Sequence, residues 1–132
     1  MRDKIFIDTN ILLYLYDVDG EKKSIAKEIL KSNYYISTQV LNEFSNISLK
    51  KLKLNTDELD TILEKIIEKT RLFIFDEQTI RFAIKIKDKY KFQYYDSLII
   101  ATALENNCNI LYSEDMQHNQ QIESLTIINP FK

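Results

Sequence analysis

The chain is 132 residues long, which is the usual size of a single domain with one hydrophobic core. Its 45% hydrophobic and 29% charged residues are typical of a folded globular protein and exclude a largely disordered chain. The formal net charge of −2 excludes a surface that is basic all over, while a local basic patch stays compatible with it. We therefore expect one domain that spans residues 1–132.

The sequence contains one cysteine and one histidine. A lone cysteine excludes an internal disulfide framework and is typical of a reducing cytosol, and the pair together excludes a zinc site built from Cys and His. No segment reaches the roughly 18 apolar residues that span a bilayer, and the N-terminal residues lack a signal-peptide pattern. These features predict a cytoplasmic protein that does not associate with membranes.

Strands and helices alternate along the chain. Short apolar runs predict strands, and apolar residues recurring every three or four positions predict helices. In chain order we predict a strand at 4–8, helices at 10–16 and 21–31, a strand at 34–37, a helix from 38, a helix at 55–69, a strand at 71–75, helices at 77–90 and 95–106, and strands at 109–113 and 125–128. Such alternation indicates a three-layer α/β/α sandwich with a mostly parallel central sheet.

Four acidic residues are predicted to lie at one edge of this sheet, because functional groups gather beyond the carboxyl ends of parallel strands. Asp8 ends the first strand, and Glu43 lies in the second turn of the helix after the second strand. Asp96 lies in the first turn of its helix, and Asp115 follows the fourth strand. The intervals are 35, 53 and 19 residues, so only the fold can bring the four together.

Each acid also has a purely structural interpretation. Asp8 can cap the following helix, Asp96 can interact with a helix dipole, and Asp115 can form an Asx turn. Glu43 shares the apolar side of its helix and has no Lys or Arg one turn away on that side, so its charge needs a partner. These separate roles do not account for the convergence of all four on one edge.

Carboxylates crowded together repel one another and raise their own pKa values unless a cation holds them. A ligand set made only of oxygen selects hard cations, so we expect Mg²⁺ or Mn²⁺; the EF-hand spacing that would favour Ca²⁺ does not occur in the sequence. A metal held by few protein oxygens leaves room for water and phosphate, which is the arrangement used to hydrolyse phosphodiester bonds.

Four segments resemble the signature blocks of PIN-domain ribonucleases, and most of all those of the VapC-type toxins of toxin–antitoxin modules. They are IDTNIL at 7–12, STQVLNEF at 37–44, YDSLIIA at 95–101 and LYSEDMQH at 111–118. Residues 127–131 resemble the end of one branch of these toxins. One departure occurs at Asn119, where this branch usually has Gly; Asn is the non-Gly residue best suited to a left-handed turn.

The resemblance implies a PIN-like nuclease domain whose metal-binding and catalytic acids are Asp8, Glu43, Asp96 and Asp115, supported by Asn10 and Ser113. It implies an endoribonuclease that uses Mg²⁺ or Mn²⁺ to hydrolyse single-stranded or looped tRNA, rRNA or mRNA, leaving 5′-phosphate and 3′-hydroxyl ends. It also implies a homodimer, inhibited by a small antitoxin protein within a type II toxin–antitoxin system.

Two other functions stay open on the sequence alone. One is a housekeeping PIN nuclease in RNA maturation, and the other is a non-catalytic PIN-fold interaction module. A short domain without an added RNA-binding module favours the toxin, and four intact acids favour catalysis. Tyr94 and Tyr95 can stack on a base or pack in a core or dimer interface, and the lysines at 50–53 and 85–91 can contact phosphate or form solvated helix faces.

Overall fold

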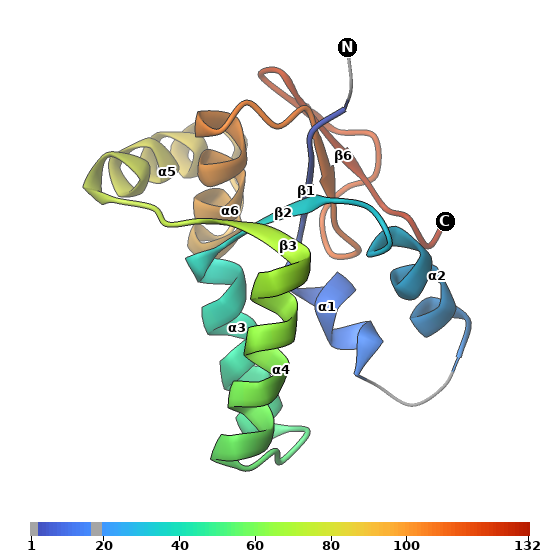
Figure 1. Cartoon of the computed structure of the whole chain (residues 1–132). Coiled ribbons are helices and arrows are strands. Elements are labelled where there is room, and N and C mark those ends of the chain that lie inside the picture. The colour runs from blue at the N-terminus through green and yellow to red at the C-terminus, as the bar shows by residue number, and fades with distance from the viewer. Residues whose placement is uncertain (1–2, 17–19) are drawn as a thin grey trace.

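The computed structural model describes residues 3–16 and 20–132 (Figure 1). The strands are β1 (Ile5–Ile7), β2 (Tyr34–Ser37), β3 (Thr70–Phe73), β4 (Ile110–Tyr112), β5 (Gln121–Ile122) and β6 (Leu125–Ile128). The helices are α1 (Thr9–Leu15), α2 (Glu21–Ile29), α3 (Thr38–Lys50), α4 (Thr56–Lys69), α5 (Glu77–Tyr90) and α6 (Tyr94–Glu105). Within these two ranges, no helix has the length and apolar character of a membrane-spanning segment.

The strands form one sheet in the order β3-β2-β1-β4-β6-β5. Every neighbouring pair is parallel except β5 and β6, which are antiparallel. Figure 1 shows α5 and α6 together on one side of the sheet and α1 and α2 on the other, while α3 and α4 extend beyond it as a pair. The predicted α/β sandwich with a mostly parallel sheet is confirmed, and it brings the carboxyl ends of β1, β2 and β4 to one edge.

The core forms where the sequence is most continuously apolar. The central strand β1 contributes Phe6 and Ile7, which are fully buried. Helix α6 is buried on every side between Ser97 and Ala103, because its residues there are apolar or small all round rather than along one stripe. Asp8 directly follows this central strand, and Asp96 lies in the first turn of this buried helix, so the core positions these two acids of the candidate site.

Strand β5 was not expected from the sequence; it pairs with β6 through Ile122 opposite Leu125. The strand is only two residues long, and its turn contains Glu123 at φ 54° where a hairpin usually has Gly or Asn. The sequence therefore lacks the usual hairpin signal at this point. Asn119, just before β5, has φ 68°, so the left-handed turn expected at this position does form.

Candidate active site at the carboxyl edge of the sheet

Asp8 lies directly after β1 and is buried, with 4% of its surface exposed. One carboxylate oxygen accepts a hydrogen bond of 2.7 Å from the backbone N–H of Thr9, and the other accepts one of 2.8 Å from Ser113 Oγ, after β4. Asp8 is also the N-cap of α1, so its structural interpretation is confirmed. Capping and membership of the acid cluster coexist in this side chain.

Glu43 finds the partners that its position on α3 requires. Thr9 Oγ1 donates a hydrogen bond of 2.7 Å to one carboxylate oxygen, and Gln39 Nε2 donates one of 3.3 Å to the other. Both donors are buried and neutral, so they orient the carboxylate without cancelling its charge. Sequence reasoning missed both: Thr9 belongs to the motif at 7–12, and Gln39 lies one helical turn before Glu43.

Asn10 joins the first segment to the loop after β4, because its Nδ2 donates a hydrogen bond of 3.1 Å to Asp115 Oδ2. Its own Oδ1 is buried and has no hydrogen-bond partner. Three consecutive residues therefore belong to the site. Asp8 is one of the acids, Thr9 donates a hydrogen bond to Glu43, and Asn10 donates one to Asp115.

The loop that carries Asp115 is also anchored through the preceding residue, Glu114. Glu114 accepts hydrogen bonds from the Tyr14 hydroxyl on α1 and from Lys22 Nζ on α2. The Tyr14 ring packs edge-on against Phe131, with ring centroids 5.1 Å apart. Asp115 therefore extends from an anchored loop, although its own side chain is exposed.

The four acids interact electrostatically. Burial, together with the weaker effect of the charges of Asp96 and Glu43, raises the pKa of Asp8 to about 7, against the hydrogen bonds from Ser113 and Thr9. Burial, followed by the charges of Glu43 and Asp115, raises the pKa of Asp96 to about 6. Asp8, Glu43 and Asp96 thus interact with one another, and Asp115 interacts with Asp96, which lies in the first turn of α6 as expected.

The donor set of the cluster fits a hard divalent cation. Among the residues that the structure describes, no ion pair joins any of the four acids to Lys or Arg. The free, buried Oδ1 of Asn10 adds an unused oxygen beside them. As the side chains stand, however, no three His, Cys, Asp or Glu residues in the described part of the chain are close enough to hold one ion. The cluster therefore has the charge and chemistry for a metal ion, and its carboxylates must move closer together to coordinate one.

We expect Ser113→Ala to raise the pKa of Asp8 further, because the hydroxyl donates to the charged form of this buried carboxylate. Losing a buried bond of this kind should lower the free energy of unfolding at pH 8 by about 1–3 kcal/mol. Carbon-detected NMR titration of Asp8 and urea denaturation measure the two effects. Ser113→Thr is the matched control, since it keeps the hydroxyl; an unchanged Asp8 pKa in Ser113→Ala would contradict the role of this bond.

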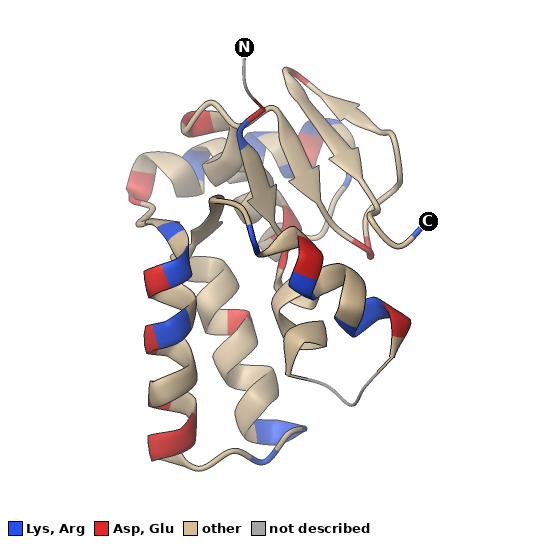
Figure 2. Cartoon of the chain, turned by 45° about the vertical axis from the view of Figure 1, so that its right-hand side comes forward, with Lys and Arg blue, Asp and Glu red and all other residues tan. Residues whose placement is uncertain are grey.

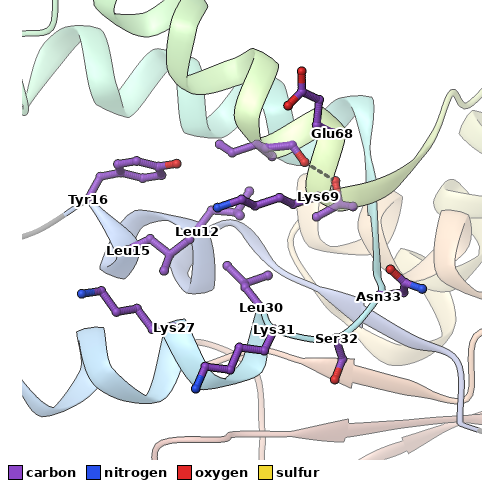
Figure 3. A pocket seen from close by; sticks show the side chains of 12 residues that line it. Leu12, Leu15, Tyr16, Lys27, Leu30, Lys31, Ser32, Asn33, Glu68 and Lys69 are labelled. Atoms are coloured by element: carbon purple, nitrogen blue, oxygen red, sulfur yellow. Dashed lines mark hydrogen bonds between the residues drawn. The ribbon is translucent and has the colours of Figure 1, made fainter.

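A hollow of about 220 Å³ adjoins the acid cluster and is lined by Gln39, Asn42, Glu43, Asn46 and Tyr95. A larger cavity of about 510 Å³ lies between α1, α2 and the end of α4 (Figure 3). Leu12, Leu15 and Leu30 supply apolar lining to it, and Lys27 and Lys69 add positive charge. None of the four acids lines this second cavity, so it takes no part in the chemistry of the cluster.

The two groups of lysines noted in the sequence, at 50–53 and 85–91, lie on the surface. Figure 2 shows basic residues at the tip of α3, where Lys50, Lys51 and Lys53 are exposed, and mixed acidic and basic residues along α4. On α5, Lys89 pairs with Glu123 at 3.5 Å. The α5 group therefore behaves in part as a solvated face with local partners, and the lysines at the tip of α3 lie on or just beyond the helix that carries Glu43.

Comparisons with known proteins agree with this fold. The family model of the PIN domain matches residues 5–121. A toxin–antitoxin complex from Klebsiella pneumoniae contains a similar chain, with a TM-score of 0.72 and 18% identity over 97% of this chain and 98% of that one. DNA-bound VapBC from Salmonella typhimurium gives 0.71 and 18%, covering 96% and 97%.

The VapC20 toxin of Mycobacterium tuberculosis, described as cleaving the sarcin-ricin loop, gives a TM-score of 0.70 at 15% identity and covers 85% of this chain and 90% of its own. No curated protein matches the sequence significantly. At these identities the solved structures establish a shared fold, and the family model covers most of the sequence. The chain belongs to the PIN domain family.

Proposed function

We propose that this protein is a metal-dependent endoribonuclease and the toxin of a type II toxin–antitoxin pair. The observation that carries the proposal is the gathering of Asp8, Glu43, Asp96 and Asp115 at one sheet edge, with no cationic side chain paired to them among the described residues. Family membership supports a nuclease, and the toxin–antitoxin complexes among its structural neighbours support a toxin. We further propose that it acts in the cytoplasm, as a homodimer that a small antitoxin inhibits.

We assign the acids roles in holding the ion and in orienting the attacking water. Asp8, Asp96 and Asp115 would hold Mg²⁺ or Mn²⁺, and Glu43 would help to hold the ion or orient the attacking water. When bound, such an ion supplies positive charge that lowers the pKa of water and offsets the charge that develops on the phosphate. The hydrogen bonds of Ser113, Thr9 and Asn10 restrict the orientations of the carboxylates that they contact.

The ribonuclease proposal is tested with purified protein and one RNA sequence, offered single-stranded and as a duplex. We expect cleavage of the single strand in Mg²⁺ or Mn²⁺, none in EDTA, and products with 5′-phosphate and 3′-hydroxyl ends. Equal cleavage in EDTA, or 2′,3′-cyclic phosphate ends, would exclude a metal-dependent hydrolysis of this kind.

The toxin proposal is tested by inducing wild type and Asp96→Asn in a bacterial host at matched protein levels. We expect growth arrest by wild type alone, because the damage then depends on the carboxylate cluster. A protein that cleaves RNA in vitro without arresting growth would instead be a maturation nuclease. Arrest by both proteins would indicate harm through binding, and a protein that neither cleaves RNA nor arrests growth would be an interaction module.

A further inference from the structure

One face of α3 next to the acid cluster carries three amide side chains beside Glu43. Gln39, Asn42, Glu43 and Asn46 follow one another at short intervals that keep them on one side of the helix. Together with Tyr95 they line the hollow of about 220 Å³. Because Glu43 belongs to both, the hollow opens directly beside the cluster.

The chemistry of the lining selects a ligand group. No Lys or Arg of the described chain lines the hollow, so it is not built to hold a phosphate. Gln39 is buried and donates a hydrogen bond to Glu43. Asn42 and Asn46 also line the hollow, and their amides do not bond the acids of the cluster. An amide offers donors and an acceptor side by side, which matches the edge of a nucleobase.

Tyr95 completes the hollow with an aromatic surface. Its side chain is 59% exposed although it is a large ring, and it lies immediately before Asp96 in the first turn of α6. Tyr94, whose ring centroid is 5.7 Å from that of Tyr95, packs against the small apolar cluster of Leu98 and its neighbours. Tyr95 therefore contacts one packed ring, tilted by 55° to its own, and leaves much of its surface open to stack on a base.

We propose that the hollow binds one unpaired base of the RNA, next to the phosphate that is cleaved, with Tyr95 stacking on the base and Asn42 and Asn46 bonding its edge. This inference rests on the proposed ribonuclease function and names the feature of the substrate that the site reads. Tyr95 adjoins Asp96 on α6, and Asn42 adjoins Glu43 on α3, so the base contacts and the acids are set by the same two helices. A base inside a duplex is paired and stacked, so the hollow requires an unpaired base.

The test compares steady-state cleavage of a single-stranded oligonucleotide by wild type, Tyr95→Ala and the matched control Tyr95→Phe. Loss of one stacked base should raise KM about 5- to 150-fold in Tyr95→Ala and leave kcat within about threefold. Tyr95→Phe keeps the ring and should recover most of the KM increase seen in Tyr95→Ala. Asn46→Ala should raise KM and alter the preference among the four bases at one substrate position.

Abasic substitution identifies that position independently of the variants. For wild type, removing the base at one position beside the cleaved bond should raise KM as much as Tyr95→Ala does. For Tyr95→Ala, the same abasic substrate should raise KM little further, because the substitution and the missing base remove the same contact. The same comparison made on binding of labelled oligonucleotide in EDTA provides a readout that does not depend on cleavage.

The outcomes separate this inference from the proposed function. If wild type cleaves RNA while Tyr95→Ala and Asn46→Ala keep its KM and its abasic profile, the base site is refuted and the ribonuclease stands. A fall in kcat alone would make Tyr95 a support for Asp96, and a loss confined to self-association or to antitoxin binding would make the hollow a protein interface; each refutes the base site. Binding with the expected abasic pattern but no cleavage would uphold the base site and refute the ribonuclease.

Discussion

Replacing Asp96 by Asn is expected to slow metal-dependent RNA cleavage by about 1,000-fold or more, without loss of folded stability. The carboxylate is one of the groups proposed to hold the ion. The ion stabilises the transition state by several kcal/mol, and a loss of about 4 kcal/mol corresponds to a 1,000-fold lower rate. Stability should not fall, because burial and the charges of Glu43 and Asp115 already raise the pKa of Asp96 to about 6 and disfavour its charged form. Initial cleavage rates and thermal unfolding measure the two effects.

Asp88→Asn is the matched control for this substitution. It makes the same chemical change on α5, at an exposed carboxylate that forms a loose ion pair of 3.8 Å with Lys91. We expect its cleavage rate and its stability to match those of wild type. An Asp96→Asn protein that cleaves within about threefold of wild type would refute the assignment of Asp96 to the catalytic cluster.

The second large effect is on the pH dependence of stability. In EDTA, we expect the midpoint of thermal unfolding to fall by about 5 °C or more between pH 5 and pH 8. The pKa of Asp8 is raised from 3.8 to about 7, chiefly by burial, and that of Asp96 from 3.8 to about 6. Between these values the folded protein keeps protons that the unfolded chain releases, so the free energy of unfolding decreases as pH rises through the window.

Asp8→Asn should remove most of this slope, because the amide stays neutral at every pH. Each pKa unit corresponds to about 1.4 kcal/mol, so Asp8 contributes on the order of a few kcal/mol to the change. Adding Mg²⁺ or Mn²⁺ at pH 8 should raise the midpoint of wild type and have a smaller effect on Asp8→Asn. A wild-type midpoint that rises from pH 5 to pH 8 in EDTA would contradict a crowded, unneutralised cluster.

Most of the fold could be predicted from the alternation of apolar runs along the sequence. A buried strand such as β1 and an all-round apolar helix such as α6 show their structure locally, and the parallel sheet follows from their order. Strand β5 could not be found in this way, because a two-residue strand has no periodicity and Glu123 occupies the turn position where Gly would have marked it.

Part of the candidate site could likewise be predicted from the sequence, and part could not. Sheet topology was sufficient to predict that Asp8 and Asp115 lie at the same sheet edge, since each follows a strand of a parallel sheet, and β1 and β4 are neighbours. How the acids are held could not be predicted, because the bond from Thr9 to Glu43 and that from Asn10 to Asp115 join residues 34 and 105 positions apart. The catalytic roles of these acids stay a prediction until cleavage is measured.

The position of β1 in the sheet has a consequence for protein synthesis. β1 leaves the ribosome before both of its neighbours, and one of these neighbours, β4, begins only at Ile110. A growing chain therefore carries a central strand with one unpaired edge, and an incomplete set of acids, until β4 and Asp115 have been made. If the protein is a nuclease that attacks cellular RNA, this strand order delays its activity until both β4 and Asp115 have been translated.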